Sequence, residues 1–204
     1  RQMCIRDRYY TTRKDNAWAE QNPEEIQQEY LISNRVTARS EKLCIRLMEG
    51  FHTQQLKVNT LDDPKRWWEV IDRTTGEVVS VDDWEFKKER EEVEIKTIPY
   101  HEYTVSFLAF LIWDPVHMYN FITNDWKDTP HQLTYDVRQP KTQKYVKEKL
   151  KRWCEENPQI DVVRFTTFFH QFTLTFDDKK REKFVEWFGY SAVSSTHLRA
   201  HETT

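Results

Sequence analysis

Residues 161–190 read DVVRFTTFFHQFTLTFDDKKREKFVEWFGY, and their pattern gives the strongest indication of the fold expected for the chain. The run Val162–Phe169 is β-branched and aromatic apart from Arg164, which predicts a buried strand. A cation in a buried strand is costly unless an anion or a hydrogen-bonding group meets it. Arg164 is therefore the first candidate for contact with a polar ligand. Asp178 is predicted to cap a following helix that ends at Gly189.

The segments before this strand alternate between strand-like and helix-like patterns. The run Tyr103–Trp113 is almost fully apolar, as in a strand buried on both faces, although a helix is an open alternative. Asp114 and Pro115 predict the start of a short helix over Val116–Trp126. Apolar residues at helical spacing predict a longer helix over Pro140–Glu156. This alternation predicts an α/β fold with a parallel sheet or barrel.

The first half of the chain carries shorter strand signals. Asn22–Glu25, with Pro at its second position, predicts the start of a short helix. Gly76 lies in the turn of a predicted β-hairpin. Strand patterns in this half cover Tyr30–Val36, Trp67–Ile71, Glu77–Val79 and Val93–Ile98.

The two ends of the chain are expected to be artefacts. Residues 3–8, Met-Cys-Ile-Arg-Asp-Arg, match the translation of a tag used in transposon-based sequencing libraries. The run Val193–Thr203 resembles the opposite strand of the same tag. We therefore expect residues 1–8 and 193–204 to be sequencing-tag artefacts outside the fold. Residues 9–192 are then expected to be part of a longer protein.

Composition excludes several classes of protein. Four of the 31 Lys and Arg and two of the 34 Asp and Glu lie in the expected tags, so the net charge without them is −5 and no nucleic-acid footprint is expected. Cys44 and Cys154 lack metal or disulfide spacing and are interpreted as reduced thiols in a cytosolic setting. No apolar run approaches the ~20 residues of a membrane span. Gly50, Gly76 and Gly189 are too scattered for a Walker A loop or a dinucleotide fingerprint.

Several longer runs occur in a recognisable order: WEV (68–70), DRTTGEVV (72–79), HEYTVSFLA (101–109), WDPV (113–116), MYN (118–120), NDW (124–126), DVVRFTTFF (161–169) and WFG (187–189). Together they closely resemble the galactosyl-N-acetylhexosamine phosphorylase family, also called lacto-N-biose or galacto-N-biose phosphorylases. The similarity covers nearly all of residues 9–192. It implies a partial N-terminal catalytic domain, an incomplete (β/α)8 TIM-like barrel with an inserted β-hairpin.

The resemblance also implies a reaction. Inorganic phosphate attacks the anomeric carbon of galactose in a β-1,3-galactosyl-N-acetylhexosamine, giving α-galactose 1-phosphate and free N-acetylhexosamine. Inversion needs one general acid at the leaving oxygen, while phosphate replaces the water of an inverting hydrolase. In the family this acid is an aspartate beyond the present segment, so no catalytic residue is assigned here and the segment alone is expected to be inactive.

The same resemblance sets the expected partners. The disaccharide and phosphate are the substrates, and no metal or organic cofactor is expected. The protein is expected to be cytoplasmic, with no nucleic-acid or membrane partner. A homodimer of the full-length enzyme is an open alternative.

Three residues match sugar-binding positions of the family. Asn120 and Arg164 match positions that hydrogen-bond the N-acetylhexosamine acceptor, and Val116 matches one packed near its acetamido group. Amide and guanidinium groups offer directed donors to hydroxyl and carbonyl oxygens. We expect Arg164 to face Asn120 across neighbouring βα units. The alternatives are that Asn120 caps or packs locally and that Arg164 forms a structural ion pair.

Other candidate residues receive structural interpretations. His117, His131 and His170 lack ligand spacing and are interpreted as structural or exposed. Tyr103 and Phe169 are interpreted as core residues rather than sugar-stacking platforms. Two alternative functions remain open, a galactosyl-rhamnose phosphorylase and a non-catalytic sugar-binding module. The isolated segment is expected to be unstable, because a cut barrel leaves strand edges unpaired.

Overall fold

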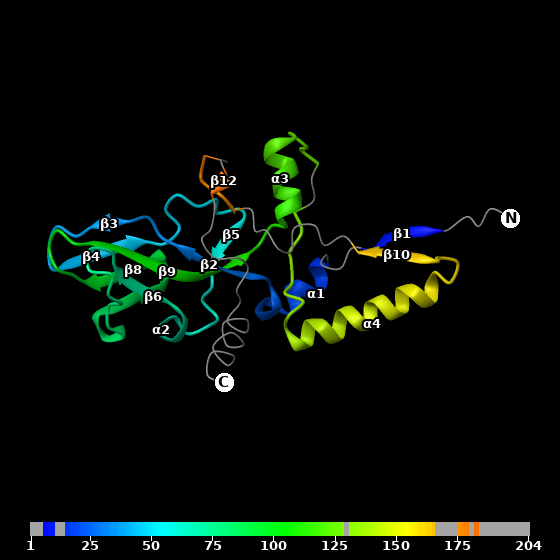
Figure 1. The fold of residues 1–204 in the computed structure, drawn as a ribbon, viewed down its shortest axis with the longest axis horizontal. Coiled ribbons are helices and arrows are strands. Elements are labelled where there is room, and N and C mark those ends of the chain that lie inside the picture. Colours follow the sequence, from blue (N-terminus) through cyan, green and yellow to red (C-terminus); the bar gives the residue numbers. More distant parts are fainter. Residues whose placement is uncertain (1–5, 11–14, 129–130, 166–174, 180–181, 184–204) are drawn as a thin grey trace.

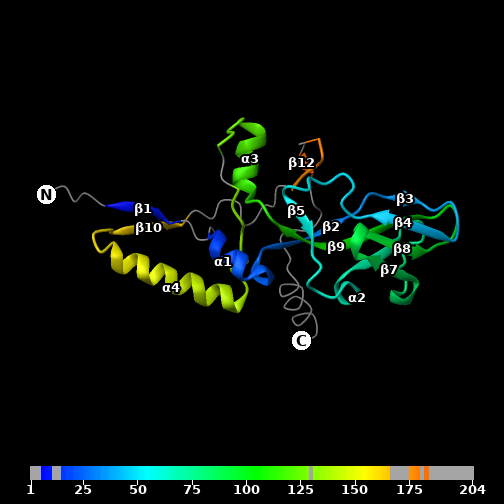
Figure 2. The ribbon, with the colours of Figure 1, turned by 180° about the vertical axis from the view of Figure 1, so that it is seen from behind.

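The computed structural model describes residues 6–10, 15–128, 131–165, 175–179 and 182–183. These residues form a mixed α/β structure with an elongated outline, in which two β-sheets occupy one end and the longest helix lies toward the other (Figure 1). Figure 2 shows the same arrangement from behind. Within these ranges, no helix is both long and apolar enough to cross a membrane.

The strand β9 (Glu102–Leu111) forms the centre of a five-stranded sheet. Its side chains are buried except at Glu102 and Ser106, which are half-buried, so the predicted burial on both faces is confirmed. Four short strands pair with β9, all antiparallel: β2 (Gln28–Ile32), β3 (Val36–Thr37), β5 (Leu56–Val58) and β6 (Glu69–Asp72).

The direction of these pairings corrects the predicted parallel sheet. Parallel neighbours need a crossover connection of about a dozen residues or more, usually a helix, whereas antiparallel strands can be joined by tight turns. All four pairings with β9 are antiparallel, so the parallel prediction is wrong for this sheet. The strand predicted over Tyr30–Val36 is also interrupted, since it is divided between β2 and β3.

A second sheet explains why β9 is buried. It is antiparallel and consists of β4 (Lys42–Arg46), β7 (Trp84–Lys87) and β8 (Glu92–Lys96). Ile45 and Ile95 of this sheet share one hydrophobic core with Val105 and Phe107 of β9. Trp68 meets Phe107 edge-on in this core, with ring centroids 6.0 Å apart. Burial of these large apolar side chains supplies the main stabilising contribution to this end of the molecule.

The predicted hairpin is confirmed, and β6 is its first arm. Ile71 forms an antiparallel bridge with Val78 across the turn. The Asp72 carboxylate accepts the backbone N–H of Thr74 at 2.9 Å, which is the local bond that Asp makes in turns. Gly76 has a φ of 81°, a left-handed conformation that glycine adopts without steric cost.

The helix α3 (Pro115–Thr123) begins shortly after β9 ends. The Asp114 carboxylate accepts the backbone N–H of His117 at 3.2 Å, so the predicted cap is confirmed. The helix ends earlier than predicted, at Thr123. Met118 of α3 is fully buried and packs in one cluster with Trp113. This contact holds α3 against the end of β9.

The helix α4 (Pro140–Glu156) has the predicted bounds. The short helix α1 (Asn16–Gln21) packs beside it, because Asp15 at the start of α1 accepts hydrogen bonds from Lys149 at 2.9 Å and from the Tyr145 hydroxyl. The remaining helical turns are η1 (Pro23–Glu25), α2 (Pro64–Trp67), η2 (Val81–Asp83) and η3 (Lys88–Arg90).

The strand β10 (Val162–Phe165) follows α4 and pairs in parallel with β1 (Asp7–Tyr10). The side chain of Arg164 is 56% exposed, so the prediction of a cation inside a buried strand is wrong here. The reason is position: β10 lies toward the end of the molecule opposite the β9 sheet (Figure 1). The predicted continuation of this strand to Phe169 lies outside the described residues.

Two short strands near the end of the described residues correct another prediction. β11 (Thr175–Phe176) and β12 (Glu182–Lys183) pair antiparallel. The helix predicted after Asp178 is therefore wrong at Glu182–Lys183. The Asp177 carboxylate accepts the Lys179 N–H at 2.9 Å, so the acidic pair directs a turn rather than a helix start. The later part of the predicted helix lies outside the described residues.

Candidate functional site

The sequence-predicted residue Asn120 is held at the C-terminal end of α3. Its side-chain Oδ1 accepts a hydrogen bond from Nδ2 of Asn124 at 2.8 Å. Its backbone carbonyl accepts the N–H of Asn124 at 3.1 Å and that of Trp126 at 3.2 Å. Asp125, between these two donors, has a left-handed φ of 52°, so the chain closes back over the helix end. The side chain of Asn120 is half-buried at this closed end.

The sequence-predicted residue Val116 lies on the same helix. It is the second residue of α3, four positions before Asn120. Positions four apart lie on the same side of an α-helix, one turn from each other. The backbone of α3 therefore brings these two candidate positions onto one helix side.

The third candidate, Arg164, lies on a separate element. Its guanidinium pairs with the Asp7 carboxylate of β1 at 2.7 Å, and the two side chains are 56% and 43% exposed. Ion pairs this exposed contribute about 0–1 kcal/mol. Figures 1 and 2 both show β10 apart from α3, so the expected facing of Arg164 and Asn120 is not present. Asp7 is also one of the residues expected to be tag sequence.

Aromatic residues pack beneath α3. Trp113 is buried and contacts the His131 ring edge-on, with centroids 4.1 Å apart. Phe121 of α3 lies 5.2 Å from the same indole. Phe176 of β11 is buried in this cluster, so a segment distant in the sequence packs against α3.

The histidine interpretations can be compared with their surroundings. His131 is exposed, and its Nε2 lies 3.3 Å from the carbonyl of Gln54. His117 is half-buried, with its Nδ1 4.0 Å from the Asp114 carboxylate. These positions agree with structural or exposed roles, while His170 lies outside the described residues.

Tyr103 is a core residue, as predicted. It is 2% exposed, and its hydroxyl accepts the backbone N–H of Ile98 at 2.9 Å. Burial raises the pKa of the Tyr103 phenol, with a smaller contribution from the charge of Asp72. The phenol therefore stays protonated and serves the packing of the sheets. Phe169, the other aromatic candidate, lies outside the described residues.

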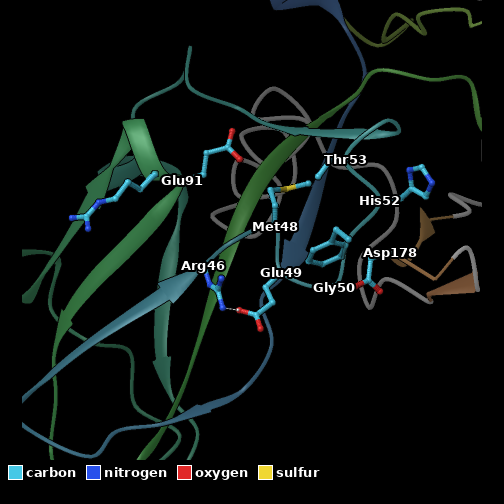
Figure 3. Close-up of a pocket in the computed structure, with 10 residues that line it drawn as sticks. Arg46, Met48, Glu49, Gly50, His52, Thr53, Glu91 and Asp178 are labelled. Carbon is cyan, nitrogen blue, oxygen red and sulfur yellow. Dashed lines mark ion pairs between the residues drawn. The ribbon is translucent and has the colours of Figure 1, made fainter.

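The structure also contains a pocket that the sequence did not predict. It has a volume of about 470 Å³ and is lined by Arg46, Met48, Glu49, Gly50, Phe51, His52, Thr53, Arg90, Glu91 and Asp178. Figure 3 shows Arg46 paired with Glu49, at 3.1 Å, on one wall and His52 near Asp178 on another. The backbone N–H of His52 donates to the carbonyl of Phe176, which connects this pocket to the cluster beneath α3.

A sequence signal for this pocket exists only in part. Gly50 has a φ of 85° and marks a sharp turn after β4, but its neighbours combine both signs of charge without catalytic or ligand spacing. Among the residues that the structure describes, no group of three or more His, Cys, Asp or Glu is arranged to hold a metal ion. The walls of the pocket combine polar and apolar side chains.

Comparison with known proteins extends these observations. The family model described as "Lacto-N-biose phosphorylase N-terminal TIM barrel domain" matches residues 1–204. A 1,3-beta-galactosyl-N-acetylhexosamine phosphorylase of Lachnoclostridium phytofermentans is 65% identical over 93% of the chain, and one of Bifidobacterium longum is 48% identical over 94%. A D-galactosyl-beta-1->4-L-rhamnose phosphorylase of Lachnoclostridium phytofermentans is 37% identical over 91%. The chain spans 26% of the length of each of these relatives.

Proposed function

The chain belongs to the lacto-N-biose phosphorylase N-terminal TIM barrel domain family, and from this premise we propose that it is part of a 1,3-β-galactosyl-N-acetylhexosamine phosphorylase. The 65% identity to one such enzyme, over nearly the whole chain, is the observation that carries the proposal. The complete protein would cleave the disaccharide with phosphate and release α-galactose 1-phosphate and N-acetylhexosamine.

The proposed reaction needs a general acid and groups that bind the acceptor sugar, and we place only the second kind within this segment. Phosphate brings its own negative charge to the anomeric carbon, and inversion needs a single acid on the leaving oxygen. We place that acid beyond the present segment. The segment itself then supplies acceptor-binding groups, and no metal or organic cofactor is part of the proposal.

Asn120, Arg164 and Val116 are the proposed acceptor-sugar residues. An amide and a guanidinium donate directed hydrogen bonds to hydroxyl and carbonyl oxygens, and an aliphatic side chain suits the acetamido methyl group. The exposed pair between Arg164 and Asp7 is weak, so exchanging it for a ligand costs little.

We also propose that the described elements form part of a (β/α)8 TIM-like barrel with an inserted β-hairpin. The direct connection from β9 to α3, the succession of α4 and β10, and the parallel pair β1–β10 support this assignment. Residues at the C-terminal ends of barrel strands and in the loops after them form active sites in this fold. Val116 and Asn120 lie on the helix that directly follows β9, whose described neighbours are antiparallel.

A galactosyl-rhamnose phosphorylase is the second candidate function. One relative with that activity in its name is 37% identical, compared with 65% and 48% for the two hexosamine enzymes. The family position matched by Val116 lies near an acetamido group, which favours the hexosamine substrate.

We propose that the protein is located in the cytoplasm. The exposed thiols of Cys44 and Cys154 fit a reducing compartment.

The full-length protein that contains this segment tests the proposal directly. Phosphate-dependent release of galactose 1-phosphate would be measured with galactosyl-β-1,3-GlcNAc, galactosyl-β-1,3-GalNAc and galactosyl-β-1,4-rhamnose. Faster turnover of the two hexosamine disaccharides is expected. Preference for the rhamnose disaccharide supports the second candidate, and hydrolysis without phosphate contradicts both.

Arg164→Ala tests the role of this side chain in the same protein. Loss of a charged hydrogen bond to the sugar should raise the acceptor KM in the synthetic direction by about 10- to 100-fold. Arg152→Ala is the matched control, because Arg152 is an exposed arginine on α4. An unchanged acceptor KM in Arg164→Ala would show that Arg164 has only a structural role.

A further inference from the structure

Two helices of this chain, α1 and α4, end with the same side-chain bond. Asn22 after α1 donates its Nδ2 to the carbonyl of Trp18 at 2.7 Å, and Asn157 after α4 donates to the carbonyl of Trp153 at 2.8 Å. Helix C-termini carry partial negative charge on their last carbonyls, so an N–H donor is stabilised there. A helix-terminal Asn in this protein therefore presents its amide nitrogen back toward the residue four positions earlier.

Asn124, which follows α3, makes this bond to a different acceptor. Its Nδ2 donates to the side-chain Oδ1 of Asn120 at 2.8 Å rather than to a backbone carbonyl. The Asn120 carbonyl already accepts two backbone N–H groups, from Asn124 and Trp126. The donor of Asn124 is thus used to hold the side chain of the residue that the family resemblance assigns to the sugar.

This bond decides which atoms Asn120 offers to a ligand. A primary amide has one oxygen that accepts and one nitrogen with two N–H donors, and a rotation by half a turn exchanges them. With Oδ1 turned toward Asn124, the two N–H groups of Nδ2 lie on the other side of the amide and remain for a ligand. Within the described part of the chain, Nδ2 of Asn120 donates to no protein atom, and the side chain is only half-buried.

We propose that Asn124 is a positioning residue that orients the amide of Asn120, so that its N–H donors face an oxygen of the acceptor sugar. This inference rests on the acceptor-binding role of Asn120 in the proposed function. It predicts that the ligand presents an acceptor at this point, such as a hydroxyl oxygen or the acetamido carbonyl. Asn124 lies directly after α3, four positions beyond Asn120, so its amide is within hydrogen-bond distance of the Asn120 side chain.

Two substitutions with opposite hydrogen-bonding character test the proposal in the full-length enzyme. Asn124→Asp places an acceptor beside Asn120, which draws its N–H donors inward and turns its oxygen toward the ligand. Asn124→Lys keeps a donor and therefore keeps the amide orientation. Asn157→Asp is the matched control, since it makes the same chemical change at the same kind of helix end on α4.

The readout is the acceptor KM in the synthetic direction, with GlcNAc and α-galactose 1-phosphate as substrates. Asn124→Asp should raise the KM for GlcNAc about tenfold, the effect of losing one directed hydrogen bond, and leave the KM for α-galactose 1-phosphate within about twofold. Asn124→Lys and Asn157→Asp should both stay within about twofold of the parent for both substrates. Thermal unfolding of each variant checks that the fold is intact.

Equal acceptor KM values for the Asp and Lys variants overturn the positioning role. If the Asp variant does not fold, Asn124→Ala replaces it: a KM increase that is absent in the Lys variant supports the proposal, and identical behaviour contradicts it. Asn120→Ala separates this inference from its premise. If Asn120→Ala leaves the acceptor KM unchanged, the proposed sugar contact itself is wrong, whereas an increase there with no difference at Asn124 rejects only the positioning role.

Discussion

Asp72 controls the turn that joins the two arms of the predicted hairpin. Its carboxylate accepts the N–H groups of Thr74 at 2.9 Å and Thr75 at 3.3 Å, and it lies 2.7 Å from Nδ1 of His101. Burial raises the pKa of Asp72, but the hydrogen bonds from His101, Thr74 and Thr75 together lower it below its ordinary value. The ionised carboxylate is therefore the form that fits this site.

The lowered pKa predicts a dependence of stability on pH. A depressed pKa in the folded state gives stabilisation that is present above the ordinary carboxyl pKa and is lost as pH falls through the folded value. Asp72→Asn should cost about 1–2 kcal/mol at neutral pH, and its difference from the parent should shrink below about pH 4. Urea unfolding of the full-length protein and the variant between pH 7 and pH 3 measures this difference, and a constant difference contradicts it.

At the residue scale, contacts between near neighbours in the sequence are predicted correctly, and contacts between distant segments are not. The turn at Asp72 and the cap at Asp114 depend on neighbours within a few positions, so their residue types were sufficient to predict them. The surroundings of Arg164 depend on which strand pairs with β10. That partner, β1, lies more than 150 positions earlier in the chain, and no local pattern predicts it.

At the scale of elements, α4 is held at its first turn by a buried acid from another segment. Glu25, at the end of η1, is 5% exposed, and its Oε2 accepts the N–H of Thr142 at 3.1 Å and its hydroxyl at 2.6 Å. Gln139 at the N-cap makes no capping bond with its side chain. Glu25 therefore takes the place of a local cap and adds a negative charge at the helix N-terminus.

Glu25→Ala should consequently destabilise the protein by about 1–3 kcal/mol, because the Thr142 groups remain buried without this acceptor. Hydrogen exchange of the amides at the start of α4 should accelerate more than exchange in β9. Glu24→Ala is the matched control, since Glu24 makes an exposed ion pair with Lys141 at 2.6 Å. Equal losses of stability in the two variants would falsify the capping role of Glu25.

The sequence pattern predicts the bounds of α4 and the burial of β9, but not the direction of the strands that pair with β9. The bounds of α4 follow from helical spacing and the flanking Pro140 and Asn157, and they agree with the structure. The burial of β9 also follows from its composition. The direction of its neighbours does not, because an apolar strand packs equally well between antiparallel partners and a second sheet as between parallel partners and helices.

At the scale of the molecule, the largest core of the described residues is complete by Leu111. Its buried members run from Leu31 to Leu111 and join both antiparallel sheets. The predicted acceptor residues lie outside this core, on α3 and β10. The chain spans 26% of the length of the relative that is 65% identical to it, and we propose that the rest of the reaction centre lies in the remaining part of the protein.

The isolated 204-residue chain should therefore release no galactose 1-phosphate from galactosyl-β-1,3-GlcNAc and phosphate. The reason is that the proposed general acid is not in this segment. The full-length protein, assayed in parallel, is the control. Measurable phosphorolysis by the isolated chain would place the acid within these residues and contradict the proposed division of tasks.

The pairing of β10 with β1 has a practical consequence for handling this protein. Asp7 and Arg8, which the sequence assigns to a tag, occupy half of the β1 ladder, since backbone groups pair without regard to side-chain identity. Any extended leader placed before residue 9 can therefore dock along β10. A proline-rich leader would disfavour this docking, because proline has no backbone N–H for the ladder, so the sequence placed before residue 9 will influence what pairs with β10.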